Sequence, residues 1–399
     1  MSQPGGGALA GVKVVDLTRV LAGPLATMIL ADMGAEVIKI EDPQGGDLYR
    51  TSGSIHLNGE AVNFLSTNRN KQSVTLDIAS PDGHAILMQL VRQADVLIEN
   101  FRPGVTSRLR IEYEQLAAIN PRLIYASITG FGSSGPCRDR AAVDPVIQAE
   151  SGIMSLTGEE GGAPVRIGTA VGDIYGAMLA AQGIGFALYS REKTGRGQKL
   201  ELALFDAALF GLIPRDGEYF ATGTVFPPMG SAHPQFVPFQ NFATRDGHVF
   251  VAAFHDALYR KLCERLGRPE LARDPDYIDN VGRSRNRAAL LAILAPIFAT
   301  RTSEEWIAEL DPVGIPIGRV NNLAEVFRHP HALHNGMVLE QEHPVAGTVR
   351  TIANPLRLSD TPAVAHSPPP LLGQHTDAVL AGLGFDAARI AALRERKVI

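Results

Sequence analysis

The chain has 399 residues, of which 45% are hydrophobic and 20% charged, and its formal net charge is −5. This composition predicts a folded protein of one large or two smaller domains, and the lack of a basic stripe argues against nucleic acid as a partner. Cys137 and Cys263 are too few for a disulfide framework and lack zinc-site spacing, so we expect no metal and a reducing, cytoplasmic location. No signal pattern is present and no apolar stretch reaches about 18 uninterrupted residues, so no membrane partner is expected.

The first part of the chain alternates strands and helices. Residues 12–18 are predicted as a buried strand, and a helix follows with Pro24 at its first position and Gly34 at its end. Residues 36–41 form a second strand, which completes a β-α-β unit of the doubly wound kind. The unit lacks G-x-G-x-x-G, so it does not indicate a nicotinamide or flavin dinucleotide.

Two further strands are predicted within residues 68–78 and 95–99. Arg69 and Lys71 lie at a strand entrance, where they either meet phosphates or form a solvated basic turn. The segment after residue 99 leaves the carboxyl end of a strand, where open α/β sheets bind ligands. It offers the amide, ring and cations that an adenine nucleotide with phosphates needs, in Asn100, Phe101, Arg102 and Arg108.

Residues 168–197 contain a loop with two glycines that leads through Asp173 into a long apolar run without proline. We predict a loop followed by a helix, with Asp173 in the first turn. The interior glycines each cost about 1 kcal/mol relative to alanine, which suggests that other backbone passes close to this helix. A helix N-terminus favours an anion, so a partly solvated Asp173 should stay ionised at neutral pH. Asp173 is either a nucleophile toward an activated acyl group or only a cap of backbone N–H groups. Asp144, before Pro145, is predicted to cap its own helix.

The remaining chain is predicted to form one helix at residues 207–220, a proline- and glycine-rich linker, and a smaller domain with a hairpin around residues 245–248. The predicted parts are a large domain at 10–205, a linker at 206–228, a small domain at 229–320 and a C-terminal segment at 321–399 that returns to the large domain.

Eight short motifs, in their order and spacing, carry a resemblance to a known family over residues 11–383. They are V-V-D-L-T-R-V-L-A-G-P, G-A-E-V-I-K-I-E, N-R-N-K-Q-S, V-L-I-E-N-F-R-P-G, I-T-G-F-G-S-S-G-P, V-G-D, K-T-G-R-G-Q and P-L-L-G-Q-H-T. The chain resembles the class III (family III) CoA-transferases, which include formyl-CoA transferase and carnitine CoA-transferase. The C-terminal third looks most like the branch that moves CoA between dicarboxylates, such as succinyl-CoA:glutarate transferases.

The resemblance implies that Asp173 is the nucleophile, which favours the catalytic interpretation over the cap. It implies an α/β fold with a large Rossmann-like domain and a smaller α+β domain, in two ring-like chains interlocked as a homodimer. It implies no permanently bound cofactor, with acyl-CoA and a small carboxylic acid as substrates. The positions that it assigns to CoA binding are Val20, Leu21, Lys71, Asn100, Phe101 and Arg108.

Substrate contacts and rival activities follow from the same resemblance. Arg19 and Arg50 either pair with the distal carboxylate of a dicarboxylyl group or are surface charges. Gly230 stands where formyl-CoA transferase has a run of glycines over its active site, and His233 is a candidate contact to the acyl group or acceptor. The racemase branch carries a histidine base where this chain has Val143, which argues against α-proton chemistry. A non-catalytic CoA-binding protein is the third alternative.

Overall fold

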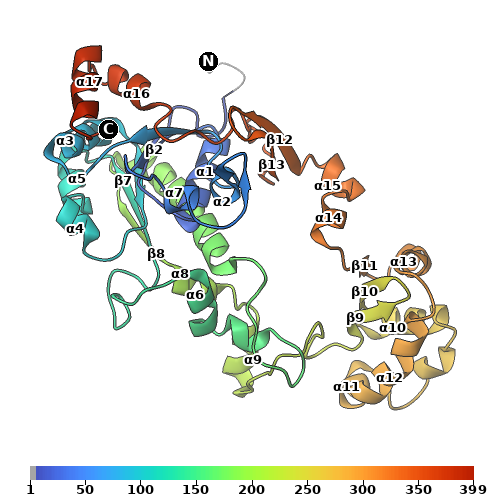
Figure 1. Ribbon diagram of the computed structural model, residues 1–399. Helices are drawn as coiled ribbons and strands as arrows, with labels where there is room; N and C mark the ends of the chain where they lie inside the picture. Colours follow the sequence, from blue (N-terminus) through green and yellow to red (C-terminus); the bar gives the residue numbers. More distant parts are fainter. Residues whose placement is uncertain (1–5) are drawn as a thin grey trace. The chain divides into compact units, whose positions relative to one another are not determined.

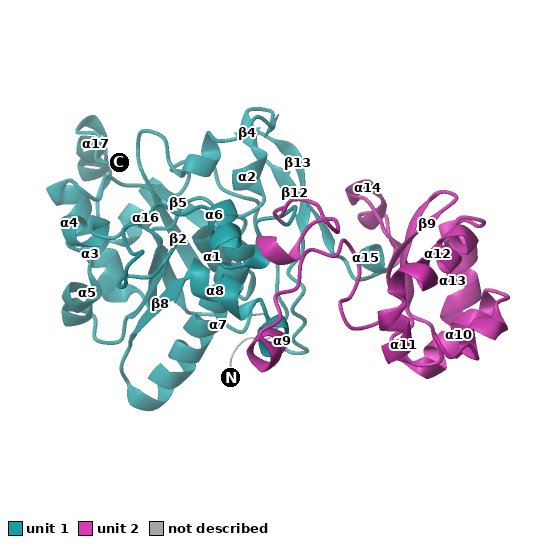
Figure 2. Cartoon of the chain, turned by 90° about the horizontal axis from the view of Figure 1, so that it is seen from below, with its two compact units in different colours: residues 1–153, 167–217, 331–399 teal, residues 154–166, 218–330 magenta. Residues whose placement is uncertain are grey.

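The computed structural model describes residues 6–399, which contain two compact units. The first unit contains residues up to 153, 167–217 and 331–399, and the second contains residues 154–166 and 218–330 (Figure 2). Each unit has its own sheet and its own hydrophobic core. The short segment 154–166 belongs to the second unit, although no pattern in the sequence sets it apart.

Six parallel strands form the central sheet of the first unit, in the order β5-β2-β1-β6-β7-β8. Their bounds are β1 (Lys13–Asp16), β2 (Glu36–Glu41), β5 (Lys71–Thr75), β6 (Val96–Glu99), β7 (Ile124–Thr129) and β8 (Lys199–Ala203). The predicted α/β fold with a parallel sheet is therefore confirmed. Strands β1, β2 and β5 are added outward on one side of the sheet, and β6, β7 and β8 on the other. The strand order therefore reverses between β1 and β6.

Helices cover both faces of this sheet (Figure 1). Side chains alternate along each strand, so Val14 packs into the core on one face and Val15 into the core on the other. The first face carries α1 (Ala22–Asp32), α6 (Asp144–Glu150), α7 (Val171–Thr194) and α8 (Leu204–Phe210). The second carries α3 (Pro81–Gln93), α5 (Tyr113–Ile119), α16 (Thr376–Gly382) and α17 (Ala387–Glu395).

Shorter elements lie around this sheet, and three of them, η2, α9 and α15, contain residues of both units. They are the 3-10 helix η1 (Leu48–Arg50), β3 (His56–Leu57), β4 (Glu60–Ala61), α2 (Val62–Leu65), α4 (Val105–Leu109), η2 (Ile153–Leu156), α9 (Arg215–Thr222), α15 (Pro330–His334), β12 (Val338–His343) and β13 (Gly347–Ile352). The C-terminal segment runs along the edge strand β5, where the N–H of His375 donates to the carbonyl of Ser73 over 2.9 Å. This contact covers a strand edge that would otherwise expose unpaired backbone groups.

Two local predictions are wrong. The single helix expected at residues 207–220 is two helices, because Gly211 and Pro214 lie between α8 and α9, and proline cannot supply the N–H that a continuous helix needs. Pro24 is the third residue of α1 and not the first, since the helix already begins at Ala22. Proline is tolerated there because the first-turn N–H groups have no partner within the helix.

Helix α7 is the longest helix among the described residues and it ends at Gly195, whose φ of 71° is left-handed. By length and composition alone it could cross a membrane, but half of its apolar window is buried within the unit. Other backbone was expected to pass close to this helix, and α1 packs closely against it. The glycines themselves contact side chains, because a Cβ at Gly176 or Gly183 would meet the side chains of Leu204 and Leu200. At Gly185 a Cβ would meet nothing within 4 Å.

The second unit is an antiparallel sheet, β11-β10-β9, covered by helices. The predicted hairpin is confirmed, with β9 and β10 paired through a turn at Arg245 and Asp246. Trp306 and Phe298 lie fully buried in the core. The elements are β9 (Phe239–Thr244), β10 (Gly247–Ala252), α10 (Asp256–Arg265), η3 (Pro269–Ala272), α11 (Asn280–Arg285), α12 (Arg287–Phe298), α13 (Ser303–Leu310), η4 (Asp311–Val313), β11 (Ile317–Arg319) and α14 (Leu323–Val326).

Alanine at Gly197 should destabilise the first unit, whereas alanine at Gly185 should stabilise it. A Cβ at Gly197 would lie 2.0 Å from the carbonyl oxygen of Leu123, which is backbone and cannot rotate away. We expect Gly197→Ala to cost about 1–3 kcal/mol. Gly185→Ala is the matched control, and it should gain up to about 1 kcal/mol of helix propensity. Urea unfolding followed by circular dichroism compares the two variants, and equal midpoints for both would contradict the contact at Gly197.

Candidate active site

The loops after β1 and β6 meet at the point where the strand order reverses, which is the place where open α/β sheets bind ligands. Asn100 connects the two loops: its Oδ1 accepts the N–H of Arg19 over 2.9 Å, and its Nδ2 donates to the carbonyl of Arg19 over 2.8 Å. The guanidinium carbon of Arg19 lies 5.6 Å from the centre of the Phe101 ring. Five of the residues singled out in the sequence, Arg19, Val20, Leu21, Asn100 and Phe101, therefore lie on two loops that the structure joins.

Val20 has an unusual backbone conformation in this arrangement. Its φ is 71°, a left-handed value that a β-branched residue rarely adopts, and its N–H donates to Asp47 Oδ1 over 2.9 Å. Leu21 directly precedes α1, so the loop delivers backbone to a helix N-terminus. Strain of this kind persists only where surrounding contacts impose it, and it is concentrated at functional sites.

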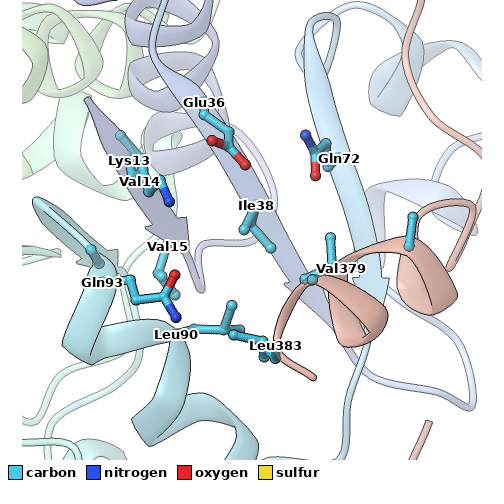
Figure 3. A pocket seen from close by; sticks show the side chains of 13 residues that line it. Lys13, Val14, Val15, Glu36, Ile38, Gln72, Leu90, Gln93, Val379 and Leu383 are labelled. Carbon is cyan, nitrogen blue, oxygen red and sulfur yellow. The ribbon is translucent and has the colours of Figure 1, made fainter. Parts of the chain in front are cut away.

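Arg108 lies in the last turn of the short helix α4 and is exposed. Phe101 lines a cavity of about 290 Å³ beside β6, β7 and β8, together with Arg102, Thr106 and Ser127. A second cavity of about 230 Å³ lies between β1, β2, α3 and α16, and none of the predicted site residues line it (Figure 3). Glutamates also line the cavity beside Phe101, and Lys71 lines a further cavity of about 370 Å³ between β2, β5 and the C-terminal segment.

Lys71 lies inside the first unit. Its ammonium donates to the carbonyl of Pro24 over 2.9 Å and to Asn68 Oδ1 over 2.8 Å, and it lies 3.2 Å from Asp16 Oδ2. Burial outweighs the attraction of Asp16 and lowers the pKa of Lys71 to about 8. The ammonium of Lys71 therefore binds the first turn of α1 from inside the unit.

Arg50 is also held internally, so the interpretation of it as a surface charge is wrong. Its Nε and Nη2 donate to the two carboxylate oxygens of Glu41 over 2.7 and 2.8 Å. The guanidinium also lies 3.6 Å from the centre of the Phe64 ring. Arg19, by contrast, is exposed.

Asp173 is the third residue of α7 and is partly exposed. Burial, and then the negative charge of Asp144, raise the pKa of Asp173 to about 7. The expectation of full ionisation at neutral pH is therefore wrong, because these two effects outweigh the helix N-terminus. Near pH 7, protonated and ionised forms of Asp173 are therefore both present.

Asp144 caps α7 and not its own helix, which sequence reasoning missed. Val143 occupies the N-cap of α6 without a side-chain hydrogen bond, and its side chain is mostly exposed. Asp144 Oδ1 instead accepts the N–H of Gly172 over 2.8 Å. The partner helix lies 28 residues further along the chain, so the spacing within α6 gave no signal.

Tyr49, in η1, is a second residue that the sequence did not single out. Burial raises the pKa of Tyr49, and the negative charges of Asp173, Asp47 and Asp144 raise it further. The phenol therefore lies within electrostatic reach of Asp173 and stays neutral. Its only sequence signal was its place in the polar, glycine-rich segment after β2.

In the second unit, Gly230 and His233 are held by local contacts. Gly230 has a left-handed φ of 59°, and its N–H donates to the carbonyl of Gly158 over 2.8 Å. His233 Nδ1 accepts the N–H of Gln235 over 3.1 Å, and its ring centre lies 4.7 Å from that of Phe236. The roles predicted for Gly230 and His233 remain predictions.

Comparison with known proteins identifies a family and several relatives. The model of CoA-transferase family III matches residues 9–376. The succinyl-CoA:glutarate CoA-transferase of Homo sapiens is 40% identical over 93% of this chain and 85% of its own length. The acetyl-CoA:oxalate CoA-transferase of Acetobacter aceti is 39% identical over 88% of this chain and 90% of its own length. The crystal structure of a CAIB/BAIF family protein from Brucella suis superposes with a TM-score of 0.86 at 40% identity, covering 95% of this chain and all of that one.

Proposed function

Since this chain belongs to CoA-transferase family III and is a CoA-transferase, we propose that it moves CoA from a dicarboxylyl-CoA donor to a free carboxylic acid through covalent intermediates on Asp173. The observation that carries the proposal is the position of Asp173, partly exposed in the first turn of α7 with a pKa of about 7. A carboxylate with a raised pKa is a better nucleophile than an ordinary one and is still ionised in a large fraction of molecules.

The proposed reaction consists of successive acyl transfers between the CoA thiol, Asp173 and the two carboxylic acids. A carboxylate oxygen of Asp173 attacks the thioester carbon, the C–S bond of the tetrahedral adduct breaks, and CoA leaves as a thiolate, which leaves a mixed anhydride on Asp173. The thiolate attacks the Asp173 carbonyl carbon, which releases the first acid and leaves an aspartyl-CoA thioester. The acceptor carboxylate attacks that thioester to form a second anhydride, and the thiolate then attacks the acceptor's carbonyl carbon to give the new acyl-CoA and free Asp173. Covalent catalysis of this kind divides one difficult exchange into easier steps.

The joined loops after β1 and β6 are proposed to hold CoA. Phe101 offers a ring for stacking on the adenine, Arg108 an exposed cation for phosphate, and Val20 and Leu21 backbone next to a helix N-terminus. Lys71 and Asn100 support these loops from within. Arg19 is proposed to pair with the distal carboxylate of the acyl group, because it is exposed beside Phe101. Glutarate and oxalate, named for the two relatives, are both dicarboxylates, which supports a dicarboxylate as acceptor.

A homodimer is part of the proposal. Large apolar side chains are exposed on α7, with exposed fractions of 57% at Met178 and 66% at Phe186 and Tyr189, and on α9, with 80% at Phe220. Exposed apolar surface of this extent is typical of association sites. Sedimentation that shows a stable monomer would contradict the dimer, interlocked or not. The cytoplasmic location stays a prediction.

The experiment that tests the activity is an exchange assay with succinyl-CoA against a panel of monocarboxylic and dicarboxylic acids. Hydroxylamine is then added to enzyme incubated with succinyl-CoA alone, and the peptide that contains Asp173 is examined by mass spectrometry. We expect a hydroxamate at Asp173 and exchange that depends on the acceptor acid. CoA binding without exchange would support the non-catalytic alternative instead.

The rate should depend on pH through Asp173. Only the ionised carboxylate attacks, and its pKa is about 7, so kcat/KM for acyl-CoA should level off above that pH. Below it, kcat/KM should fall by about tenfold for each pH unit as the carboxyl becomes protonated. Initial rates between pH 5 and pH 9 measure this profile. A rate that is constant down to about pH 5 would contradict the raised pKa.

A further inference from the structure

A pair of side chains on α6 connects that helix to the loop before the nucleophile. Asp144 Oδ1 accepts the N–H of Gly172 over 2.8 Å and lies 3.4 Å from the N–H nitrogen of Asp173. Its Oδ2 accepts a hydrogen bond from Gln148 Nε2 over 2.6 Å. Asp144 and Gln148 are both buried, so water competes little for these contacts.

Gln148 extends the connection to the loop itself. Its Oε1 accepts the N–H of Ile167 over 2.8 Å, and its Nε2 lies 3.2 Å from the carbonyl oxygen of Thr169. The two side chains thus hold both ends of the stretch from residue 167 to residue 173. The donor and acceptor of each hydrogen bond are fixed, because a carboxylate can only accept and Gln148 must therefore present its amide NH₂ to Asp144.

The backbone leaves little room at this contact. A Cβ on Gly172 would lie 3.1 Å from Asp144 Oδ1 and 3.2 Å from Ile147 Cγ2, which is tighter than ordinary van der Waals contact. The glycine before Asp173 is therefore explained by the approach of α6. Any change in Asp144 acts directly on the backbone that carries the nucleophile.

We propose that Asp144 and Gln148 are positioning residues, which fix the first turn of α7 for attack by Asp173 and keep a second negative charge beside it. This inference rests on the proposed function. Two other titratable groups lie near this site, in η1 and the turn before it. Tyr49 is neutral and feels the charges of Asp173 and Asp144, and Asp47 acts on Tyr49 and pairs with Lys39 over 2.9 Å. Of the two carboxylates, Asp144 is the one that acts on Asp173 itself.

The charge and the hydrogen-bond connection can be separated by substitution. Asp144→Asn keeps an acceptor for Gly172 but removes the charge and turns an NH₂ group toward the NH₂ group of Gln148. We expect kcat above pH 8 to fall by about tenfold to a hundredfold, with an unchanged KM for succinyl-CoA, and the acidic limb of the pH profile to move to lower pH. Gln148→Met leaves the charge of Asp144 in place, so it should lower kcat while the limb stays near the wild-type position.

The double variant Asp144→Asn/Gln148→Glu reverses the polarity of the pair. The new amide donates to the new carboxylate, whose other oxygen can accept the N–H of Ile167. The hydrogen bond to the carbonyl of Thr169 is lost, so kcat should recover in part relative to Asp144→Asn. Glu150→Gln is the matched control, since it removes a carboxylate from the same helix that is exposed and paired with Arg140. It should leave both kcat and the limb unchanged.

An unmoved acidic limb in Asp144→Asn, or no recovery of kcat in the double variant, would overturn the inference. A limb that moves equally in Glu150→Gln would also overturn it, because the effect would then be one of net charge. The wild-type enzyme is treated with succinyl-CoA and hydroxylamine in the same series. If the wild-type enzyme forms no adduct at Asp173, the proposed function fails. If the wild-type enzyme forms the adduct but the variants of Asp144 and Gln148 behave like it, only the positioning role fails.

Discussion

Replacing Asp173 by alanine should lower kcat for acceptor-dependent CoA exchange by at least about a thousand-fold, because the variant has no atom that can take the acyl group. Direct attack by an acceptor acid would lack the effective concentration that a nucleophile fixed in the protein provides, so it should restore little of the rate. Exchange is measured by separating the two acyl-CoA species after incubation. Full activity in Asp173→Ala would end the proposal that Asp173 is the nucleophile.

Asp173→Asn separates loss of chemistry from loss of structure. The pKa of Asp173 is raised from its ordinary value of 3.8 to about 7 in the folded chain. The folded state therefore loses stability as the pH rises between these two pKa values, because ionising Asp173 costs more in the folded than in the unfolded chain. The asparagine variant lacks this effect. Relative to wild type, its melting temperature should therefore increase with pH across this window and stay higher at pH 8. An inactive variant that is more stable than wild type at pH 8 shows that activity was not lost by unfolding.

The elements nearest the site could be predicted from the sequence where the signal is local. The strand at Glu36–Glu41 contains three β-branched residues between Gly34 and the polar segment that begins at Asp42, and the structure has it at the predicted bounds. The place of Asp173 in the first turn of a helix followed from the glycine loop before it and the apolar run after it. Both signals lie within a few residues of the feature that they predict.

The partners of the site could not be predicted, because they are distant in sequence. Lys71 lies 55 residues from Asp16, and nothing near it indicates whether its ammonium faces a ligand or the core. Asp144 had the local pattern of a helix cap, and its place on another helix depends on how α6 and α7 pack. The ionisation of Asp173 was misjudged for the same reason, since burial and Asp144 are both effects of tertiary structure.

Replacing Asp47 by alanine should destabilise the first unit by about 3–5 kcal/mol, the usual effect of leaving one partner of a buried ion pair. Asp47 Oδ2 lies 2.9 Å from Lys39 Nζ, and both side chains are fully buried. The ammonium of Lys39 is thus at hydrogen-bonding distance from this carboxylate oxygen, which makes the contact a charge-assisted one. Burial opposes the charge of Lys39, but the carboxylates of Asp16 and Asp47 raise its pKa. Without Asp47, the buried ions Lys39, Lys71 and Asp16 have an excess positive charge. The urea midpoint measures the loss.

Stability and function should separate in the double variant Lys39→Met/Asp47→Leu. Removing both charges leaves the Lys71–Asp16 pair balanced, so the double variant should be more stable than Asp47→Ala alone. The double variant still lacks the acceptor for the N–H of Val20, which Asp47 Oδ1 supplies over 2.9 Å. This hydrogen bond is the contact by which Asp47 holds the strained backbone of Val20. CoA affinity, measured by calorimetry, should therefore stay weakened while stability recovers. Equal recovery of both would show that Asp47 serves the fold alone and that the conformation of Val20 does not depend on it.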